Sequence, residues 1–182
     1  EAIGFDPNST EAFVSRSITY DYLDEFQLAL KDINQTIRIA PENSYNYFEK
    51  GNLQYRNQYF KEALKEFRYC HEQDSLEVDY LNMLVLTLNK LGKYDEALKH
   101  LENYLDFSNL NLDQLVEALR VKGSLYAAMG QHDLSVRSFT EALLLDINDE
   151  TRAWLLFLRG KVLMKTESYD SAKNDFERAI KL

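Results

Sequence analysis

The chain has 182 residues, of which 45% are hydrophobic, so it is long and apolar enough to bury a core of ordinary size. Two prolines and six glycines argue against a β-rich fold and against a flexible linker. The net charge of −9 is spread without a basic block, so we do not expect nucleic acid as the main partner. The longest apolar stretch, residues 153–158, is far too short for insertion into a membrane.

A repeat sets the register of the whole chain. Small residues recur at steps of 34, 34, 38 and 37 residues, and a phenylalanine, leucine or isoleucine follows each of them four residues later. The small residues are Ala29, Ala63, Ala97, Ser135 and Ala172, and the larger ones are Ile33, Phe67, Leu101, Phe139 and Phe176. Self-similarity at about 34 residues is typical of stacked helical hairpins, none of which can bury its apolar face alone.

In chain order, each unit begins with apolar or small residues at helical spacing and continues, after a short turn, into a second helix. From the first unit to the fifth, the marking residues are Phe13, Ser17, Tyr20, Phe26, Ala29 and Ile33; Tyr47, Gly51, Phe60, Ala63 and Phe67; Leu81, Leu84, Leu88, Tyr94 and Ala97; Leu119, Gly123, Tyr126, Phe139 and Ala142; and Leu156, Gly160, Leu163, Tyr169, Ala172 and Phe176. A small residue at a helix crossing lets two backbones approach, and the larger residue fills the space on the facing helix.

The spacing of the repeat lengthens twice. Four extra residues follow the third unit, within residues 110–115, and three follow the fourth, near residues 148–150. Asn111 and Asn148 are plausible N-caps, so we predict that two helices are longer by about one turn. Such insertions would project from one edge of the array and offer a second candidate contact surface.

This pattern resembles the tetratricopeptide repeat family. The resemblance is carried by the small residues Ser17, Gly51, Val85, Gly123 and Gly160, and by the turn residues Phe26, Phe60, Tyr94, His132 and Tyr169. Val85 and His132 fit the family pattern poorly. The closing proline of the family is kept at Pro41 and is replaced in the next three units by Ser75, Asn109 and Ile147.

The resemblance implies an all-α fold, a right-handed superhelical solenoid of antiparallel helix pairs. We expect a single array over residues 1–182, in which 1–9 end a preceding repeat and 10–43, 44–77, 78–111, 116–149 and 153–182 are repeats. Because both ends lie within repeats and lack a polar cap, we expect the chain to be a fragment of a longer protein. The alternative is a complete chain that self-associates through its uncapped ends.

In this family the first helices of successive repeats line a concave groove that binds a partner. The groove positions implied for this chain are Val14, Ile18, Tyr22, Tyr45, Phe48, Asn52, Tyr55, Met83, Leu86, Asn89, Arg120, Val121, Ser124, Trp154, Phe157 and Lys161. Among them we expect the largest contributions from Val14, Phe48, Tyr55, Met83, Arg120 and Phe157. Some apolar positions, such as Met83 and Leu86, could instead belong to the core.

Charges along the predicted groove sort by sign, although Arg56 and Glu117 break the pattern. The acidic residues of the first three units are Glu11, Asp21, Glu49 and Asp79, and the basic residues from the third unit onward are Lys90, Arg120, Lys161 and Lys165. Such a groove would orient a bound peptide. A chance distribution of these few charges is the alternative.

The sequence contains no pattern that predicts catalysis, a metal site or a cofactor. The three histidines, His71, His100 and His132, lie in three different units, and a metal site needs clustered ligands. Cys70 stands where other units have Ala142 or Ala179, so we interpret it as a small core residue. A single cysteine also argues against a disulfide framework. We favour the cytoplasm as the location, with a bacterial periplasm or a secretory lumen as the alternatives. We therefore expect no enzyme, no metal and no cofactor.

We expect a protein–protein interaction scaffold that holds an extended or helical segment of a partner in the groove. Two alternatives remain: a structural subunit of a large assembly, such as a secretion, transport or ciliary machine, and a substrate-guiding accessory domain of an enzyme. Some members of the family clamp the carboxylate tails of chaperones. Here only Asn52 fits that clamp, because Phe48 stands at a lysine position and Glu117 and Val121 at basic ones. We therefore do not expect a chaperone-tail clamp.

Overall fold

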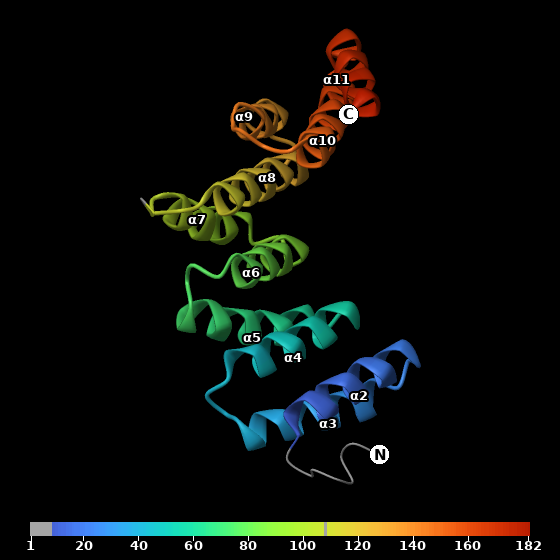
Figure 1. The fold of residues 1–182 in the computed structure, drawn as a ribbon, viewed down its shortest axis with the longest axis vertical. Helices are drawn as coiled ribbons and strands as arrows, with labels where there is room; N and C mark the ends of the chain where they lie inside the picture. The colour runs from blue at the N-terminus through green and yellow to red at the C-terminus, as the bar shows by residue number, and fades with distance from the viewer. Residues whose placement is uncertain (1–8, 108) are drawn as a thin grey trace. The chain divides into compact units, whose positions relative to one another are not determined.

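The computed structural model describes residues 9–107 and 109–182. Within these residues it forms ten α-helices and no strand, which confirms the all-α prediction (Figure 1). The helices are α2 (Thr10–Tyr22), α3 (Phe26–Ile39), α4 (Ser44–Arg56), α5 (Phe60–Gln73), α6 (Val78–Lys90), α7 (Tyr94–Leu105), α8 (Leu112–Ala128), α9 (His132–Leu143), α10 (Asp149–Lys165) and α11 (Tyr169–Lys181). The predicted end of a preceding repeat falls mostly on residues 1–8, outside the described residues.

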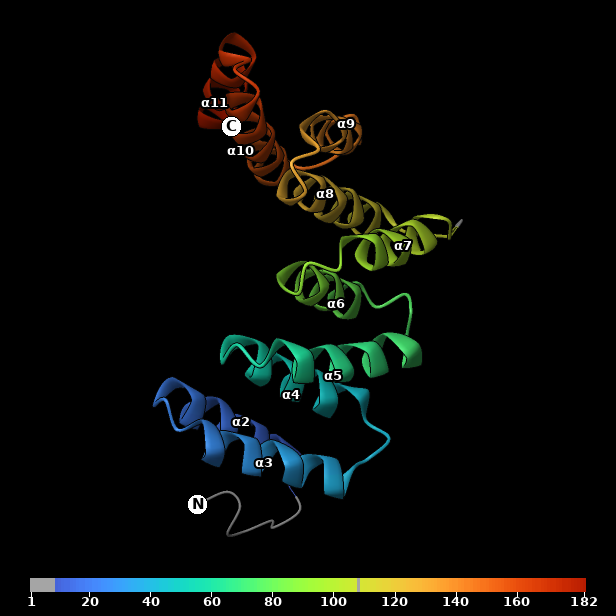
Figure 2. The same ribbon diagram turned by 180° about the vertical axis from the view of Figure 1, so that it is seen from behind.

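The chain divides into two compact units, the first ending at Leu91 and the second beginning at Gly92. In the first unit α2 packs on α3, α3 on α4, α4 on α5 and α5 on α6; in the second the same succession runs from α7 to α11 (Figures 1 and 2). This is the predicted succession of antiparallel helix pairs. The boundary falls inside the third predicted repeat, 78–111, so a single array over 1–182 stays a prediction.

Three glycines allow close crossings between the helices of a pair. A Cβ atom added at Gly51 would lie 2.6 Å from Phe67, and one added at Gly123 would lie 2.7 Å from Phe139. Gly160 has the same relation to Phe176, at 2.7 Å. Each phenylalanine follows its glycine by sixteen residues. The helices of a pair therefore cross where a small residue of one helix faces a large residue of the other, as the repeat pattern predicted.

Two repeats place a hydroxyl at the same crossing. In the first, the Ser17 Oγ of α2 donates to the carbonyl oxygen of Ala29 in α3 at 2.9 Å. In the fourth, the direction is reversed: the Ser135 Oγ of α9 donates to the carbonyl oxygen of Gly123 in α8 at 2.7 Å. All four residues are buried. A serine thus replaces one of the two small residues without leaving a buried polar atom unpaired.

The added residues lengthen two helices, as predicted. Both α8 and α10 have 17 residues, against 13 in α2, α4 and α6. The Asn111 side chain caps α8 by accepting from the backbone N–H of Gln114 at 2.9 Å, and the Asn148 side chain caps α10 in the same way at 2.8 Å from Thr151. Both helices therefore begin one turn earlier, at predicted N-caps.

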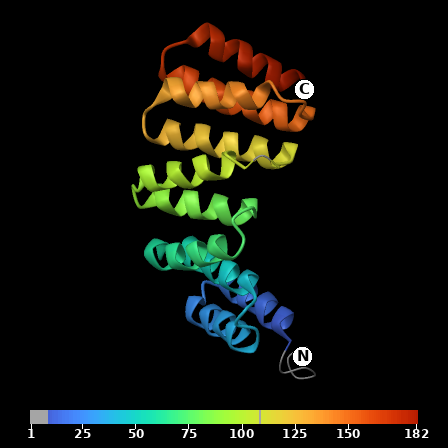
Figure 3. The ribbon, with the colours of Figure 1, turned by 90° about the vertical axis from the view of Figure 1, so that its left-hand side faces the viewer.

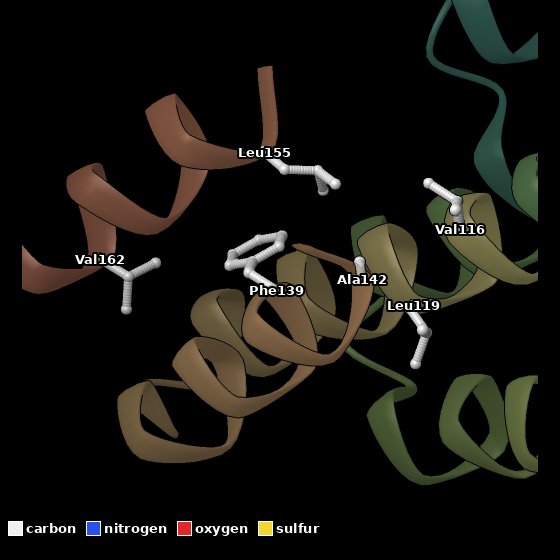
Figure 4. Close-up of a cluster of buried hydrophobic side chains, with 6 residues drawn as sticks. All are labelled: Val116, Leu119, Phe139, Ala142, Leu155 and Val162. Atoms are coloured by element: carbon white, nitrogen blue, oxygen red, sulfur yellow. The ribbon is translucent and has the colours of Figure 1, made fainter. Parts of the chain in front are cut away.

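The added turns make contacts inside the second unit. In α8, the added residue Leu115 is half-buried and packs against a core cluster that includes Val116, Phe139 and Leu155 (Figure 4). In α10, the Arg152 guanidinium donates to the carbonyl oxygen of Leu143 at 3.1 Å, where α9 ends. Such donors satisfy carbonyls that a helix end leaves unpaired. The added turns thus make stabilising contacts within their own unit, which was not expected from the sequence.

Candidate partner-binding surfaces

The inner face of each unit is formed by the first helices of its pairs. In the first unit α2 contacts α4 and α4 contacts α6, whereas α3 and α5 do not approach each other within the described residues. In the second unit α8 contacts α10, and among the described residues α9 does not approach α11. Within a stack, helices that approach every second neighbour lie on the inner side, and Figure 3 shows the helices of each unit stacked one on the next. The predicted groove helices therefore lie on the inner side within each unit.

The inner face of the first unit is rich in aromatic side chains from α4 and α6. The Phe48 ring of α4 lies 5.0 Å from the Tyr80 ring of α6 and 5.8 Å from the Phe67 ring of α5, measured between centroids. The hydroxyls of Ser44 and Tyr80 are 3.1 Å apart and share a hydrogen bond. Phe48 is half-buried, so it belongs both to the surface and to the packing between three helices.

Two tyrosines on α4 keep their hydroxyl protons at neutral pH. Burial, followed by the negative charge of Glu49, raises the pKa of Tyr45 above its usual value. Burial alone raises the pKa of Tyr55, whose ring lies 5.2 Å from that of Phe60. Tyr45 is nevertheless 49% exposed. Its ring therefore offers a partner an apolar surface together with a neutral hydroxyl group.

The other predicted groove residues of the first unit divide into two classes of exposure. Ile18, Tyr22 and Leu86 are exposed, and the exposed fraction of Leu86 is 41%, so Leu86 does not belong to the core. The half-buried residues are Val14, Asn52, Met83 and Asn89. The structure thus brings an accessible apolar face together on α2, α4 and α6.

Several charges that the sequence analysis assigned to the groove are paired. The Asp21 carboxylate accepts from Arg56 Nε at 2.6 Å and from Asn57 Nδ2 at 2.7 Å. In the second unit, Arg120 Nε donates to the Glu117 carboxylate at 2.7 Å. The predicted sorting of charge by sign therefore rests on fewer free charges than the sequence indicated.

The inner face of the second unit is smaller than predicted. Val121 is 4% exposed and is inaccessible to a partner. Ser124 donates its hydroxyl hydrogen to the Arg120 carbonyl oxygen at 3.0 Å. Between α8 and α10 there is a cavity of 220 Å³ whose lining includes Ser124, Phe139, Lys161 and Lys165. Lys161 also lies over the Phe157 ring, at 5.4 Å from its centroid.

Trp154 and Phe157, two predicted groove residues, line a larger cavity of 620 Å³ together with residues of α11. Their rings stack at a centroid distance of 5.4 Å, and Phe157 lies 6.2 Å from Phe176. From α11 come Phe176, Ala179 and Ile180, of which the sequence analysis assigned none to a binding site. The repeat register marks Phe176 as a core position, so only the structure could reveal its exposure.

Comparison with known proteins settles the family. The sequence profile described as the tetratricopeptide repeat matches residues 78–109, 116–148 and 155–182, together more than half of the chain. The chain belongs to the tetratricopeptide repeat family. A TPR repeat-containing protein of Methanocaldococcus jannaschii is 27% identical over 154 residues, which make up 84% of this chain and 26% of that protein. The chain thus spans about a quarter of the length of this curated relative.

Solved tetratricopeptide repeat structures share the fold. PilF of Pseudomonas aeruginosa matches with a TM-score of 0.72 and 17% identity, over 98% of this chain and 78% of that one. MamA of Desulfovibrio magneticus matches with a TM-score of 0.69 and 15% identity, over 95% of this chain and 94% of the MamA chain. YrrB, described as having an unusual peptide-binding site, matches with a TM-score of 0.60 and 18% identity, over 99% of this chain and 89% of the YrrB chain. At these identities the likeness shows the fold alone.

Tetratricopeptide repeats commonly serve as scaffolds for protein interaction. In residues 9–107 and 109–182 no group of three or more histidine, cysteine, aspartate or glutamate side chains could hold a metal ion. Burial raises the pKa of the Cys70 thiol to about 12, and its Sγ donates to the Ser44 carbonyl oxygen at 3.3 Å. Cys70 is fully buried, as predicted for a core residue. None of the described helices is long and apolar enough to cross a membrane.

Proposed function

We propose that this tetratricopeptide repeat chain is a protein–protein interaction scaffold whose first unit holds a partner segment on the face of α2, α4 and α6. The observation that supports this proposal is the aromatic surface around Phe48 and Tyr45, which remains accessible between two helices of a folded core. Exposed aromatic side chains beside a rigid scaffold are typical of binding hot spots.

The chemistry of this face favours a segment that carries apolar side chains and positive charge. Tyr45 and Leu86 offer exposed apolar area, and Met83 offers an adaptable half-buried surface. Glu49 on α4 and Asp79 on α6 add negative charge at the same face. We therefore propose an extended or helical partner segment in which basic residues flank apolar ones.

We further propose that the chain itself has no catalytic activity and needs no cofactor. The face described above contains aromatic rings, aliphatic groups and carboxylates without an activated nucleophile. The buried free thiol of Cys70 suits a reducing compartment, so we propose the cytoplasm as the location.

The test compares the partners captured by the wild-type chain with those captured by a variant of this face. Tyr45→Ala and Leu86→Ala, combined in one chain, remove exposed side chains and should leave helix content and melting unchanged. Leu28→Ala on α3 is the matched control, because Leu28 is 42% exposed on a second helix. We expect the double variant to lose a partner that the control retains, and a fluorescence titration with the identified segment should show binding weaker by at least about tenfold. An unchanged partner set and affinity would refute the proposal.

A further inference from the structure

The cavity of 220 Å³ on the inner face of the second unit is formed entirely by helices that pack on one another. All of its lining residues belong to α8, α9 and α10, and each of these helices contacts the other two. Small-molecule sites usually enclose about 300–1,000 Å³. The cavity therefore suits one bulky side chain of a partner better than a whole small molecule.

Short side chains of α8 leave the space for this cavity. The lining residues on α8 are Ser124, Ala127 and Ala128. At the same repeat positions, α4 carries the larger residues Asn52, Tyr55 and Arg56. The hollow thus follows from the residues that α8 places on the inner face.

The rest of the lining is apolar on one side. Phe139 of α9 and Val162 of α10 are 1% and 5% exposed, and Leu158 of α10 is half-buried. The Ser124 hydroxyl already donates to the Arg120 carbonyl oxygen, so it needs no partner from outside. An apolar side chain in this cavity would replace water against carbon atoms, which favours binding.

Two lysines border the same cavity, one turn apart on α10. Lys161 and Lys165 are both exposed, and among the described residues no carboxylate forms an ion pair with either of them. The dipole of α10 favours a lysine at position 165, in the last turn, but Lys161 precedes that turn. Like charges at this spacing repel each other. A carboxylate placed beside them would relieve that repulsion.

The Lys161 ammonium is held in place before any ligand arrives. Its Nζ lies 5.4 Å from the centroid of the Phe157 ring, and the Trp154 ring stacks on Phe157. A cation over an aromatic ring is attracted to that face and keeps donors free on its other side. Because the side chain is already restricted, pairing with a carboxylate orders it less than it would a free lysine.

We propose that the cavity between α8 and α10 binds an acidic segment of a partner protein. One large aliphatic side chain of that segment enters the cavity, and carboxylates of neighbouring residues pair with Lys161 and Lys165. We choose a partner protein over a second copy because two chains of net charge −9 repel each other as whole molecules. The site shares no residue with the inner face of the first unit, so either proposal can fail without the other.

The probe is a synthetic peptide with Glu-Leu-Glu at its centre, flanked by glycine and serine, acetylated at one end and amidated at the other. NMR titration of the methyl-labelled chain reports on the cavity and also measures weak binding. We expect saturable shifts of the Ala127, Ala128 and Val162 methyl signals, which weaken as salt is raised. A peptide with Gln-Leu-Gln should bind about tenfold more weakly. One with Glu-Ser-Glu should lose at least about tenfold, because the apolar side chain is gone.

Variants of the chain test the charges and the cavity separately. Lys161→Gln with Lys165→Gln should weaken the Glu-Leu-Glu peptide about tenfold. Lys173→Gln with Lys181→Gln is the matched control, because it removes the same charge from α11, outside the cavity, and should bind as the wild type does. Ala128→Leu, at an exposed position of α8, should fill the cavity and abolish the shifts while helix content is kept. Lys161→Glu with Lys165→Glu should transfer the preference to a Lys-Leu-Lys peptide.

Four results would overturn the proposal. The first is equal binding of the Glu-Leu-Glu and Gln-Leu-Gln peptides. The second is an equal loss of binding in the cavity variant and in the α11 control, which would show attraction by net charge alone. The third is binding that requires a free carboxyl terminus on the peptide, which would assign the site to a chain end. The fourth is self-association in sedimentation experiments that Ala128→Leu abolishes, which would identify a second copy as the occupant.

Discussion

The close crossings at Gly123 and Gly160 should respond differently to the same substitution, because only the first should be destabilised by it. An alanine Cβ at either position would lie 2.7 Å from the nearest atom of its phenylalanine ring, whereas ordinary contact begins at 3.4 Å. The ring must therefore shift by about 0.7 Å in both cases. Phe139 is 1% exposed, packs with Leu155 and Val162 and borders the smaller cavity of 220 Å³, whereas Phe176 is half-buried beside the cavity of 620 Å³. Phe176 therefore has more room to move than Phe139.

The free energies of two opposing effects decide whether each substitution stabilises or destabilises the protein. Replacing a helical glycine by alanine stabilises the helix by about 1 kcal/mol. Overpacking a closed core costs about 1–3 kcal/mol. Gly123→Ala should therefore lower the free energy of unfolding by about 1 kcal/mol, whereas Gly160→Ala should leave it unchanged or raise it by up to about 1 kcal/mol.

Urea unfolding followed by far-UV circular dichroism and by the fluorescence of Trp154 measures both effects. Two probes are needed because repeat proteins can unfold in more than one step. Phe139→Leu provides the control: in that background the ring is gone, and Gly123→Ala should become stabilising. A double-mutant cycle should then show a coupling of about 1 kcal/mol or more. Equal effects of the two glycine substitutions, or no coupling, would refute the argument from ring mobility.

Three further predictions concern buried polar groups and helix caps. Asp175→Ala should destabilise the second unit by about 3 kcal/mol in urea unfolding, because it leaves the Arg159 guanidinium without its paired carboxylate, whose side chain is 1% exposed. Stability should fall as pH rises above about 9, because the unfolded Cys70 thiol ionises there while the folded one, with a pKa of about 12, stays protonated. Cys70→Ala should flatten that part of a pH series, and an unchanged slope would refute this assignment. Asn111→Ala and Asn148→Ala should each lower the free energy of unfolding by about 1 kcal/mol through loss of an N-cap, and the melting temperature should fall accordingly.

Local chemistry was sufficient to predict the helices and their crossings. Small residues at sixteen-residue separation from larger ones place the crossings, and this depends only on helix geometry. The extra turns of α8 and α10 were predictable for the same reason, because Asn111 and Asn148 act within their own first turn. Interactions confined to a few neighbouring residues can be predicted from the sequence alone.

The candidate surfaces needed the tertiary structure. Val121 and Leu86 are both aliphatic residues at predicted groove positions, yet Val121 is 4% exposed and Leu86 is 41% exposed. The pairing of Asp21 with Arg56 likewise joins two helices across 35 residues of sequence. Helical periodicity shows which residues share a face, but it does not show which neighbour covers that face.

The sequence by itself determined the repeat, the all-α fold and the family, because each repeat carries its own crossing residues. Only the tertiary structure decided that Trp154 and Phe157 face a cavity beside Phe176, and that Arg152 braces the end of α9. The physical reason is that burial depends on the side chains a neighbouring helix brings to a face, and these come from another part of the chain or from a partner.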